Sequence, residues 1–182
     1  MERNREGLPS EPSSEARIGE WVLAYGCRLR GYLWAATGSP DDADELIQEV
    51  FHRAWKSRHR YREEGKPLAY LLRIADRLVI DRARRRSAMT VPEETWRAVE
   101  PGDNGEPPWV RLQRQEATRA LEEAMNQLSP IQRRVLLLKY YGDLTFAEIA
   151  EVVGCPLNTA LSHARRGLER LRQVLATTGE RP

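Results

Sequence analysis

Hydrophobic residues recur every three to four positions along most of this 182-residue chain. That spacing places them on one face of an α-helix, so most of the chain is expected to form helices that bury one side. No stretch alternates hydrophobic and polar residues for long enough to form a strand, and the predicted fold class is therefore all-α. Helices are expected at about residues 15–37, 40–55, 67–86, 109–128, 130–141, 146–153 and 156–172.

The second of these helices has the clearest start signal. Ser39 offers an N-cap, Pro40 suits the first helical position, and the acids that follow lie where the helix dipole favours negative charge. One face is apolar from Ala43 to Trp55, and the other face carries Asp44, Glu45, Gln48, Glu49 and His52. Such a polar face is either solvated or docks a basic partner, and the pattern favours neither.

The stretch Lys56–Lys66, before the third helix, lacks apolar periodicity and combines basic residues with His59 and Tyr61. This composition suits single-stranded nucleic acid, because bases stack on aromatic rings and phosphates pair with cations. A plain connecting loop is the alternative.

The third helix ends in a dense run of basic residues: Arg82, Arg84, Arg85 and Arg86. Positive charge is ordinary at a helix C-terminus, but this density suggests phosphate contacts. Asp76 and Asp81 on the same helix are expected to pair with neighbouring arginines.

Residues 88–108 differ in composition from the rest of the chain. They contain four prolines and two glycines, and five acids face a single arginine. Prolines and glycines at this frequency disfavour a regular element. The segment is predicted to be an acidic linker between two helical domains, with few contacts crossing it.

Residues 144–172 have the pattern of two helices around a sharp turn. Thr145 and Glu148 have the spacing of a capping box, and Gly154 suits a left-handed turn. Small or apolar residues share the inward face of the second helix: Ala160, Ala164, Leu168 and Leu171. Its outward residues are polar and basic, which suits a DNA groove, so a helix-turn-helix is predicted. The alternative is an ordinary helical hairpin with a solvated basic face.

Composition narrows the possible functions. The net charge is only +2, so nucleic-acid binding would have to rely on local patches. Cys27 and Cys155 are isolated, so neither structural zinc nor a disulfide is expected. The absence of Gly-rich phosphate loops and of HExxH or GxSxG motifs argues against an enzyme, and no cofactor is expected. Without an apolar signal segment or a membrane-spanning run, a cytoplasmic protein with no membrane contact of its own is expected.

Three segments, in this order, resemble the extracytoplasmic-function (ECF) class of bacterial sigma factors. DDADELIQEVFHRAW, at 41–55, resembles the region 2 helix that grips the polymerase clamp, and AYLLRIADRLVIDRARRR, at 69–86, resembles the promoter-melting helix. Residues 128–172 resemble region 4. The resemblance covers about residues 20–173 and implies a sigma factor that directs promoter recognition, DNA melting and transcription initiation. The implied partners are core RNA polymerase (through the beta-prime clamp and beta flap), promoter DNA and an anti-sigma factor.

The resemblance also implies roles for individual residues. Binding to the polymerase clamp is assigned to Asp44, Glu45, Gln48 and Glu49. Binding to the minus-10 element and to single-stranded DNA is assigned to Arg58, His59, Arg60, Tyr61, Arg62, Lys66, Tyr70, Arg73, Arg77, Arg82, Arg84, Arg85 and Arg86. Binding to the minus-35 element is assigned to Asn158, Thr159, Leu161, Ser162, His163, Arg165 and Arg166. The acidic linker matches the segment that the family threads through the polymerase RNA channel.

Some positions depart from the family pattern. Tyr70 stands where the family usually has tryptophan, and Arg77 where it often has asparagine. Leu161 and His163 lie where the recognition helix commonly has basic residues, which leaves the promoter sequence open. A stand-alone helix-turn-helix repressor or activator and a helical adaptor remain as rival hypotheses.

The predicted organisation has five parts. An N-terminal arm (1–14) precedes a region 2-like domain (15–87). The acidic linker (88–108) leads to a region 4-like helix-turn-helix domain (109–176), and a short tail (177–182) follows.

Overall fold

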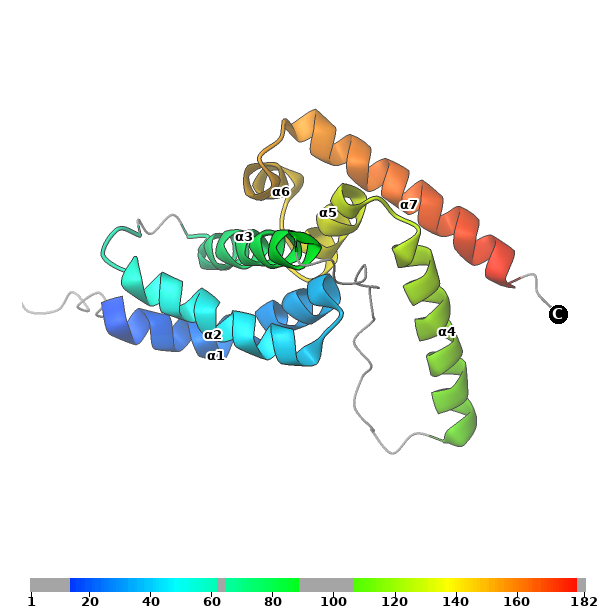
Figure 1. Ribbon diagram of the computed structural model, residues 1–182, viewed down its shortest axis with the longest axis horizontal. Helices are drawn as coiled ribbons and strands as arrows, with labels where there is room; N and C mark the ends of the chain where they lie inside the picture. The colour runs from blue at the N-terminus through cyan, green and yellow to red at the C-terminus, as the bar shows by residue number, and fades with distance from the viewer. Residues whose placement is uncertain (1–13, 62–64, 89–106, 180–182) are drawn as a thin grey trace, which may run out of the picture.

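A computed structural model of the protein describes residues 14–61, 65–88 and 107–179. Within these ranges the regular elements are seven α-helices, which confirms the predicted all-helical fold. Figure 1 shows them in two groups, α1 to α3 and α4 to α7. All but the last residue of the predicted N-terminal arm, together with Arg62 and nearly all of the linker, lies outside the described residues. Among the helices described, none is long and apolar enough to cross a membrane.

The first group consists of α1 (Ser14–Thr37), α2 (Pro40–Lys56) and α3 (Pro67–Ala88). Each helix packs against the other two, and their apolar faces meet in one core. The residues buried at its centre include Leu29, Leu33, Val50, Leu71 and Ala75. The recurrence of hydrophobic residues every three to four positions therefore identifies the buried sides of all three helices.

The predicted start of α2 is confirmed in atomic detail. The Ser39 hydroxyl accepts a hydrogen bond from the Asp42 backbone N–H at 3.3 Å, and Pro40 is the first helical residue. At the other end the apolar face is shorter than predicted, because Trp55 is exposed. The guanidinium of Arg58 lies over the Trp55 ring, 4.4 Å from its centroid, so this ring contacts a cation instead of the core.

The second group consists of α4 (Pro108–Asn126), α5 (Pro130–Tyr140), α6 (Phe146–Val153) and α7 (Leu157–Gly179). Helix α7 packs against the other three. It is longer than predicted, because buried Val174 continues its inward stripe. The predicted linker, 88–108, loses one residue at each end to a helix. Ala88 is the last residue of α3, and Pro108 is the first residue of α4, where its missing N–H is no disadvantage.

Helices α6 and α7 form the predicted helix-turn-helix. Thr145 and Glu148 make the capping box: the Thr145 hydroxyl accepts from the Glu148 backbone N–H at 3.3 Å, and the Glu148 carboxylate accepts from the Thr145 backbone N–H at 2.9 Å. Gly154 ends α6 with a φ of 77°. Pro156 lies just before α7, and its carbonyl accepts from the backbone N–H groups of Thr159 and Ala160. Local sequence signals therefore determine this motif.

The two groups of helices pack against each other, so the prediction of few contacts between the domains is wrong. Helix α1 contacts α5, and α3 contacts α6 (Figure 1). Linker composition describes the linker alone and carries no information on whether the surfaces it joins are complementary.

A buried polar cluster lies at the centre of this domain interface. Arg134 of α5 donates two hydrogen bonds to the carboxylate of Asp76 on α3, which also accepts from the Tyr32 hydroxyl at 2.9 Å. Asp76 is only 1% exposed. The expected pairing with a neighbouring arginine is therefore wrong, because Asp76 lies on the side of α3 that faces α1 and α5, and its arginine comes from the other domain.

The turn between α5 and α6 comes close to α3. Gly142 is buried, and a Cβ atom placed on it would lie 2.5 Å from the Leu138 carbonyl oxygen and 2.7 Å from Cδ1 of Leu72. The neighbouring Tyr141 ring lies against Gly31 of α1. The absence of side chains at these two glycines lets the domains approach closely.

Candidate nucleic-acid interface

Three aromatic side chains cluster at one end of the first domain. The ring of Tyr61, just after α2, lies 4.9 Å from that of Trp21 on α1 and 4.8 Å from that of Tyr70 on α3, between centroids. The Tyr70 hydroxyl is 2.6 Å from the Ser57 hydroxyl, which orients the ring. The two tyrosines were predicted for single-stranded DNA, and Trp21 supports them from the core.

A cavity of about 270 Å³ lies beside these tyrosines. Its lining combines aromatic, basic and acidic side chains: Arg60, Tyr61, Lys66, Ala69, Tyr70, Arg73, Glu148 and Glu151. Five of these residues were predicted from the sequence to bind the minus-10 region. Aromatic faces beside cations offer stacking for a base and pairing for its phosphates. We refer to this cavity as the aromatic hollow.

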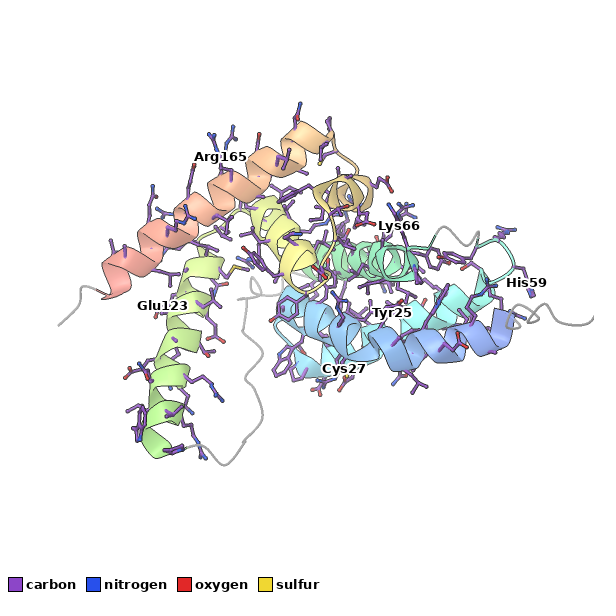
Figure 2. All side chains as sticks on the ribbon, turned by 180° about the vertical axis from the view of Figure 1, so that it is seen from behind. Tyr25, Cys27, His59, Lys66, Glu123 and Arg165 are labelled. Atoms are coloured by element: carbon purple, nitrogen blue, oxygen red, sulfur yellow. The ribbon has the colours of Figure 1, made fainter. Side chains whose placement is uncertain are left out.

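Two carboxylates from α6 pair with cations of the aromatic hollow. Nζ of Lys66 lies 3.2 Å from Oε1 of Glu148, and an Nη atom of Arg73 lies 3.1 Å from Oε2 of Glu151. Figure 2 shows Lys66 between α3 and α6. Partial burial alone would raise the pKa of Glu148, but hydrogen bonds from Thr145 and Lys66 outweigh it and lower that pKa. Glu148 is therefore held as a carboxylate at neutral pH.

The basic end of α3 is partly neutralised by α2. Arg82 and Arg86 both donate to the carboxylate of Asp42, and Arg82 also pairs with Glu45 at 3.0 Å. Arg84 and Arg85 are exposed. The structure thus brings together residues that were assigned to two roles, clamp binding and phosphate binding.

The other predicted single-strand residues lie farther from the aromatic hollow. His59 is exposed near the end of the first domain (Figure 2), and Arg77 is exposed on α3. Arg58 donates to the Trp55 carbonyl oxygen at 2.9 Å as well as stacking on that ring. Of the predicted group, the structure gathers Arg60, Tyr61, Lys66, Tyr70 and Arg73 around one cavity.

The acidic face of α2 is exposed or half-buried and carries all four predicted clamp-binding residues: Asp44, Glu45, Gln48 and Glu49. Asp44 accepts from Arg30 of α1 at 2.5 and 3.0 Å, and this bonding lowers the pKa of Asp44. Glu49 accepts from Arg53 at 2.7 Å, which likewise lowers its pKa. Both groups are therefore charged at neutral pH and available to a basic partner that displaces exposed arginines.

The outer face of α7 carries the residues predicted for the minus-35 element. The exposed ones are Asn158, Leu161, Ser162, Arg165 and Arg166, and the half-buried ones are Thr159 and His163. Leu161 is 41% exposed, so it lies on the outer surface and not in the core. Figure 2 shows Arg165 projecting away from the body of the protein.

Sequence reasoning missed several residues of this interface. Trp21 was identified only as an apolar helix position, and Asp42 only as a helix-start acid. Glu148 was identified as a cap, and Glu151 was not singled out. Trp21, Asp42 and Glu148 each had a local signal that explained them, whereas Glu151 had none. All four make a contact with a residue distant in the sequence.

Two family descriptions match the chain. Residues 21–89 match Sigma-70 region 2, and residues 118–171 match Sigma-70, region 4. The first match falls on α1 to α3, and the second covers most of α4 through α7. Two such helical domains in this order, the second with a helix-turn-helix, define a sigma factor.

Similar proteins identify the family of sigma factors to which the chain belongs. An ECF RNA polymerase sigma factor SigK from Mycobacterium ulcerans (strain Agy99) is 30% identical over 134 residues, which cover 73% of this chain and 72% of the relative. An ECF RNA polymerase sigma factor RpoE from Cereibacter sphaeroides is 28% identical over 165 residues, 89% of this chain and 88% of the relative. This chain belongs to the ECF family of RNA polymerase sigma factors, whose members are not enzymes.

Solved structures share the fold. The sigma factor RpoE from Bartonella quintana, in complex with the anti-sigma factor NepR, has a TM-score of 0.72 at 21% identity, over 88% of this chain and 97% of that chain. CnrH, in complex with the cytosolic domain of CnrY, has a TM-score of 0.65 at 17% identity, over 90% of each chain. At these identities the likeness concerns the arrangement of the helices.

Proposed function

We propose that this ECF sigma factor divides promoter recognition between its two helical domains. The first domain holds core polymerase and the separated strand of the minus-10 element, and the second domain reads the minus-35 element. The observation that carries this division is the aromatic hollow, where Tyr61 and Tyr70 lie beside three cationic side chains. Stacking of an unpaired base on such rings contributes about 1–3 kcal/mol per base, and this stabilises melted DNA over duplex.

The minus-35 contact is assigned to the outer face of α7. Its exposed residues include polar groups that suit base edges, Asn158 and Ser162, and two arginines that suit phosphates, Arg165 and Arg166. Leu161 offers an apolar contact for a thymine methyl group. Two basic positions common in the family are absent, so we expect this contact to depend on few phosphates and to show a shallow salt dependence.

The clamp contact is assigned to the acidic face of α2. Asp44 and Glu49 are exposed enough to exchange Arg30 and Arg53 for basic groups of the polymerase. Exposed ion pairs of this kind contribute little to stability, so the exchange costs little.

The remaining partners follow from family membership and from the complexes in which similar proteins have been solved. RpoE was co-crystallised with the anti-sigma factor NepR, and the structure of CnrH was solved in complex with the cytosolic domain of CnrY. We propose that this chain is held by an anti-sigma factor in the cytoplasm and that its linker enters the RNA channel of the polymerase.

The test is transcription in vitro from a pool of promoter fragments, with and without core RNA polymerase. Specific transcripts that require both proteins support the proposal, whereas a shift of duplex DNA by the chain alone supports a stand-alone repressor. Two variants then separate the domains: Arg60→Gln in the aromatic hollow, and Arg165→Gln with Arg166→Gln on α7. On a template with an artificially unpaired minus-10 bubble, the Arg60→Gln defect should shrink and the α7 defect should persist. Equal behaviour of both variants on paired and unpaired templates would contradict the division of roles.

A further inference from the structure

The aromatic hollow is walled on one side by the second domain. Glu148 and Glu151 of α6 form part of its lining, together with the basic and aromatic residues of the first domain. The side chain of Glu148 is largely buried, at 13% exposed, whereas the side chain of Lys66 is 55% exposed. The hollow in this arrangement therefore lies at the contact between the two domains, with the side chains of Lys66, Arg73 and Glu151 still partly exposed.

The chemistry of that wall opposes nucleic acid. Lys66 and Arg73 are the cations that would meet phosphates, and each is paired with a carboxylate of α6. A phosphate that approached either cation would also approach a negative charge, because each cation is already paired with a carboxylate. Juxtaposed like charges are strongly unfavourable at interfaces.

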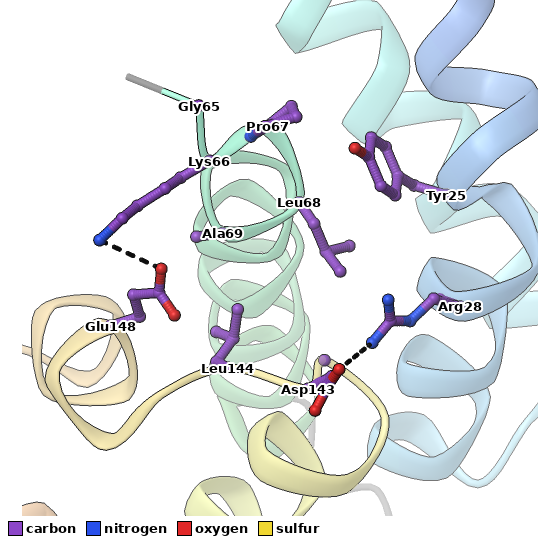
Figure 3. Close-up of a pocket in the computed structure, with 11 residues that line it drawn as sticks. Tyr25, Arg28, Gly65, Lys66, Pro67, Leu68, Ala69, Asp143, Leu144 and Glu148 are labelled. Carbon is purple, nitrogen blue, oxygen red and sulfur yellow. Dashed lines mark ion pairs between the residues drawn. The ribbon is translucent and has the colours of Figure 1, made fainter. Parts of the chain in front are cut away.

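Further contacts hold α6 in this position. Behind the hollow, Arg134 binds the buried Asp76. On the α1 side, Arg28 pairs with Asp143 at 3.6 Å, across a second inter-domain cavity of about 250 Å³ (Figure 3). The Lys66–Glu148 pair closes the other side of that cavity (Figure 3). The arrangement thus rests on contacts along the whole domain interface and not on the two acids alone.

We propose that the packed arrangement is a self-inhibited state of the free sigma factor, in which the Glu148 and Glu151 carboxylates occupy the single-strand site until the domains separate. This inference rests on the proposed role of the aromatic hollow. The acidic face of α2 and the outer face of α7 both remain exposed in the packed state. Polymerase and the minus-35 element can therefore bind first, and a polymerase that holds the domains apart uncovers the hollow.

The test measures binding of the full chain to a fluorescein-labelled oligo(dT) of about 12 nucleotides by fluorescence anisotropy. The test variant is Glu148→Gln with Glu151→Gln, which removes both charges and keeps the capping box, because glutamine also serves at that position. Its matched control is Glu116→Gln with Glu123→Gln, which removes two exposed charges from α4. Arg60→Gln is added to the test variant to verify that any gain arises in the hollow.

We expect the test variant to bind the oligonucleotide about tenfold more tightly than wild type, because the competent fraction rises. The affinity of the matched control for the oligonucleotide should rise less than about twofold, because charges removed far from the hollow act through solvent, where salt screens them. Adding Arg60→Gln should remove part of the gain. In wild type, a carbodiimide should join Lys66 to Glu148, and saturating oligonucleotide should suppress that cross-link.

Equal affinity of wild type and test variant, with cross-linking unaffected by bound oligonucleotide, would overturn the self-inhibited state and leave the proposed function standing. If neither form binds oligonucleotide, even with core polymerase present, the role of the hollow itself is wrong. The wild-type cross-link is measured without any substitution, so the inference stays testable if a variant folds poorly.

Discussion

Replacing Gly142 by alanine should destabilise the protein, although it adds only one methyl group. The added Cβ would lie 2.5 Å from the Leu138 carbonyl oxygen and 2.7 Å from Cδ1 of Leu72. Carbon atoms pack best at about 3.5–4.0 Å, so the second contact is short by roughly 1 Å. The Leu72 methyl group can turn aside, but the carbonyl of Leu138 is backbone at the end of α5, so the turn must move.

The size of the effect follows from overpacking in a close-packed interior, which costs about 1–3 kcal/mol. For a chain of this length, each kcal/mol lowers the melting temperature by about 2–4 °C, so a decrease of about 2–12 °C is expected. Since Leu72 belongs to the other domain, the same change should loosen the domain interface and strengthen oligo(dT) binding.

The matched control is Gly26→Ala. Gly26 lies inside α1, and nothing lies within 4 Å of a Cβ placed there. Alanine in a helix interior is more stable than glycine by about 0.5–1 kcal/mol, so this variant should melt slightly above wild type. Melting curves by far-UV circular dichroism compare the three proteins. A Gly142→Ala protein that melts at or above wild type would refute the packing argument.

Three further predictions concern the buried cluster and the recognition helix. Arg134→Met should lower the free energy of unfolding in urea by about 3–5 kcal/mol, because it leaves Asp76 buried without a cation. Adding Asp76→Asn should recover part of that loss. Additive effects of the two substitutions would mean that the pair is not coupled. Burial, and then the charge of Asp76, raise the pKa of Tyr32, so the stability that this neutral phenol contributes is present below pH ~10 and is lost as pH rises further. In urea unfolding at stepped alkaline pH, the free energy of unfolding of Tyr32→Phe should decline less steeply with pH than that of wild type. Parallel declines in the two proteins would argue against the cluster. Leu161→Lys should leave the melting temperature unchanged, since Leu161 is 41% exposed, and should steepen the salt dependence of promoter binding by about one unit; an unchanged slope would place Leu161 away from DNA.

Features that depend on nearby residues could be predicted from the sequence. The start of α2 at Ser39 and the capping box of Thr145 with Glu148 depend on residues three positions apart, so the pattern and the structure agree. The helix-turn-helix follows for the same reason, with Gly154 in the left-handed conformation. The aromatic and basic residues around Tyr61 could be recognised by type, though not the cavity that they form.

Features that depend on two distant surfaces could not be predicted. Asp76 and Arg134 are 58 residues apart, and nothing in either helix indicates that they meet. The same holds for Lys66 and Glu148, which come from different domains. The proline-rich linker suggested independent domains, but a flexible connection is also what allows two surfaces to find each other.

The two contacts of Glu148 restrict which domain exchanges between this protein and other sigma factors keep its structure intact. Its carboxylate caps α6 through Thr145 and also pairs with Lys66 in the first domain. A chimaera that takes its second domain from another sigma factor keeps the helix start if the grafted residue is glutamate or glutamine. Only glutamate also preserves the ion pair, so a glutamine graft would fold normally yet weaken the contact between domains. Exchange of promoter-reading modules between such proteins would then alter basal activity as well as target choice.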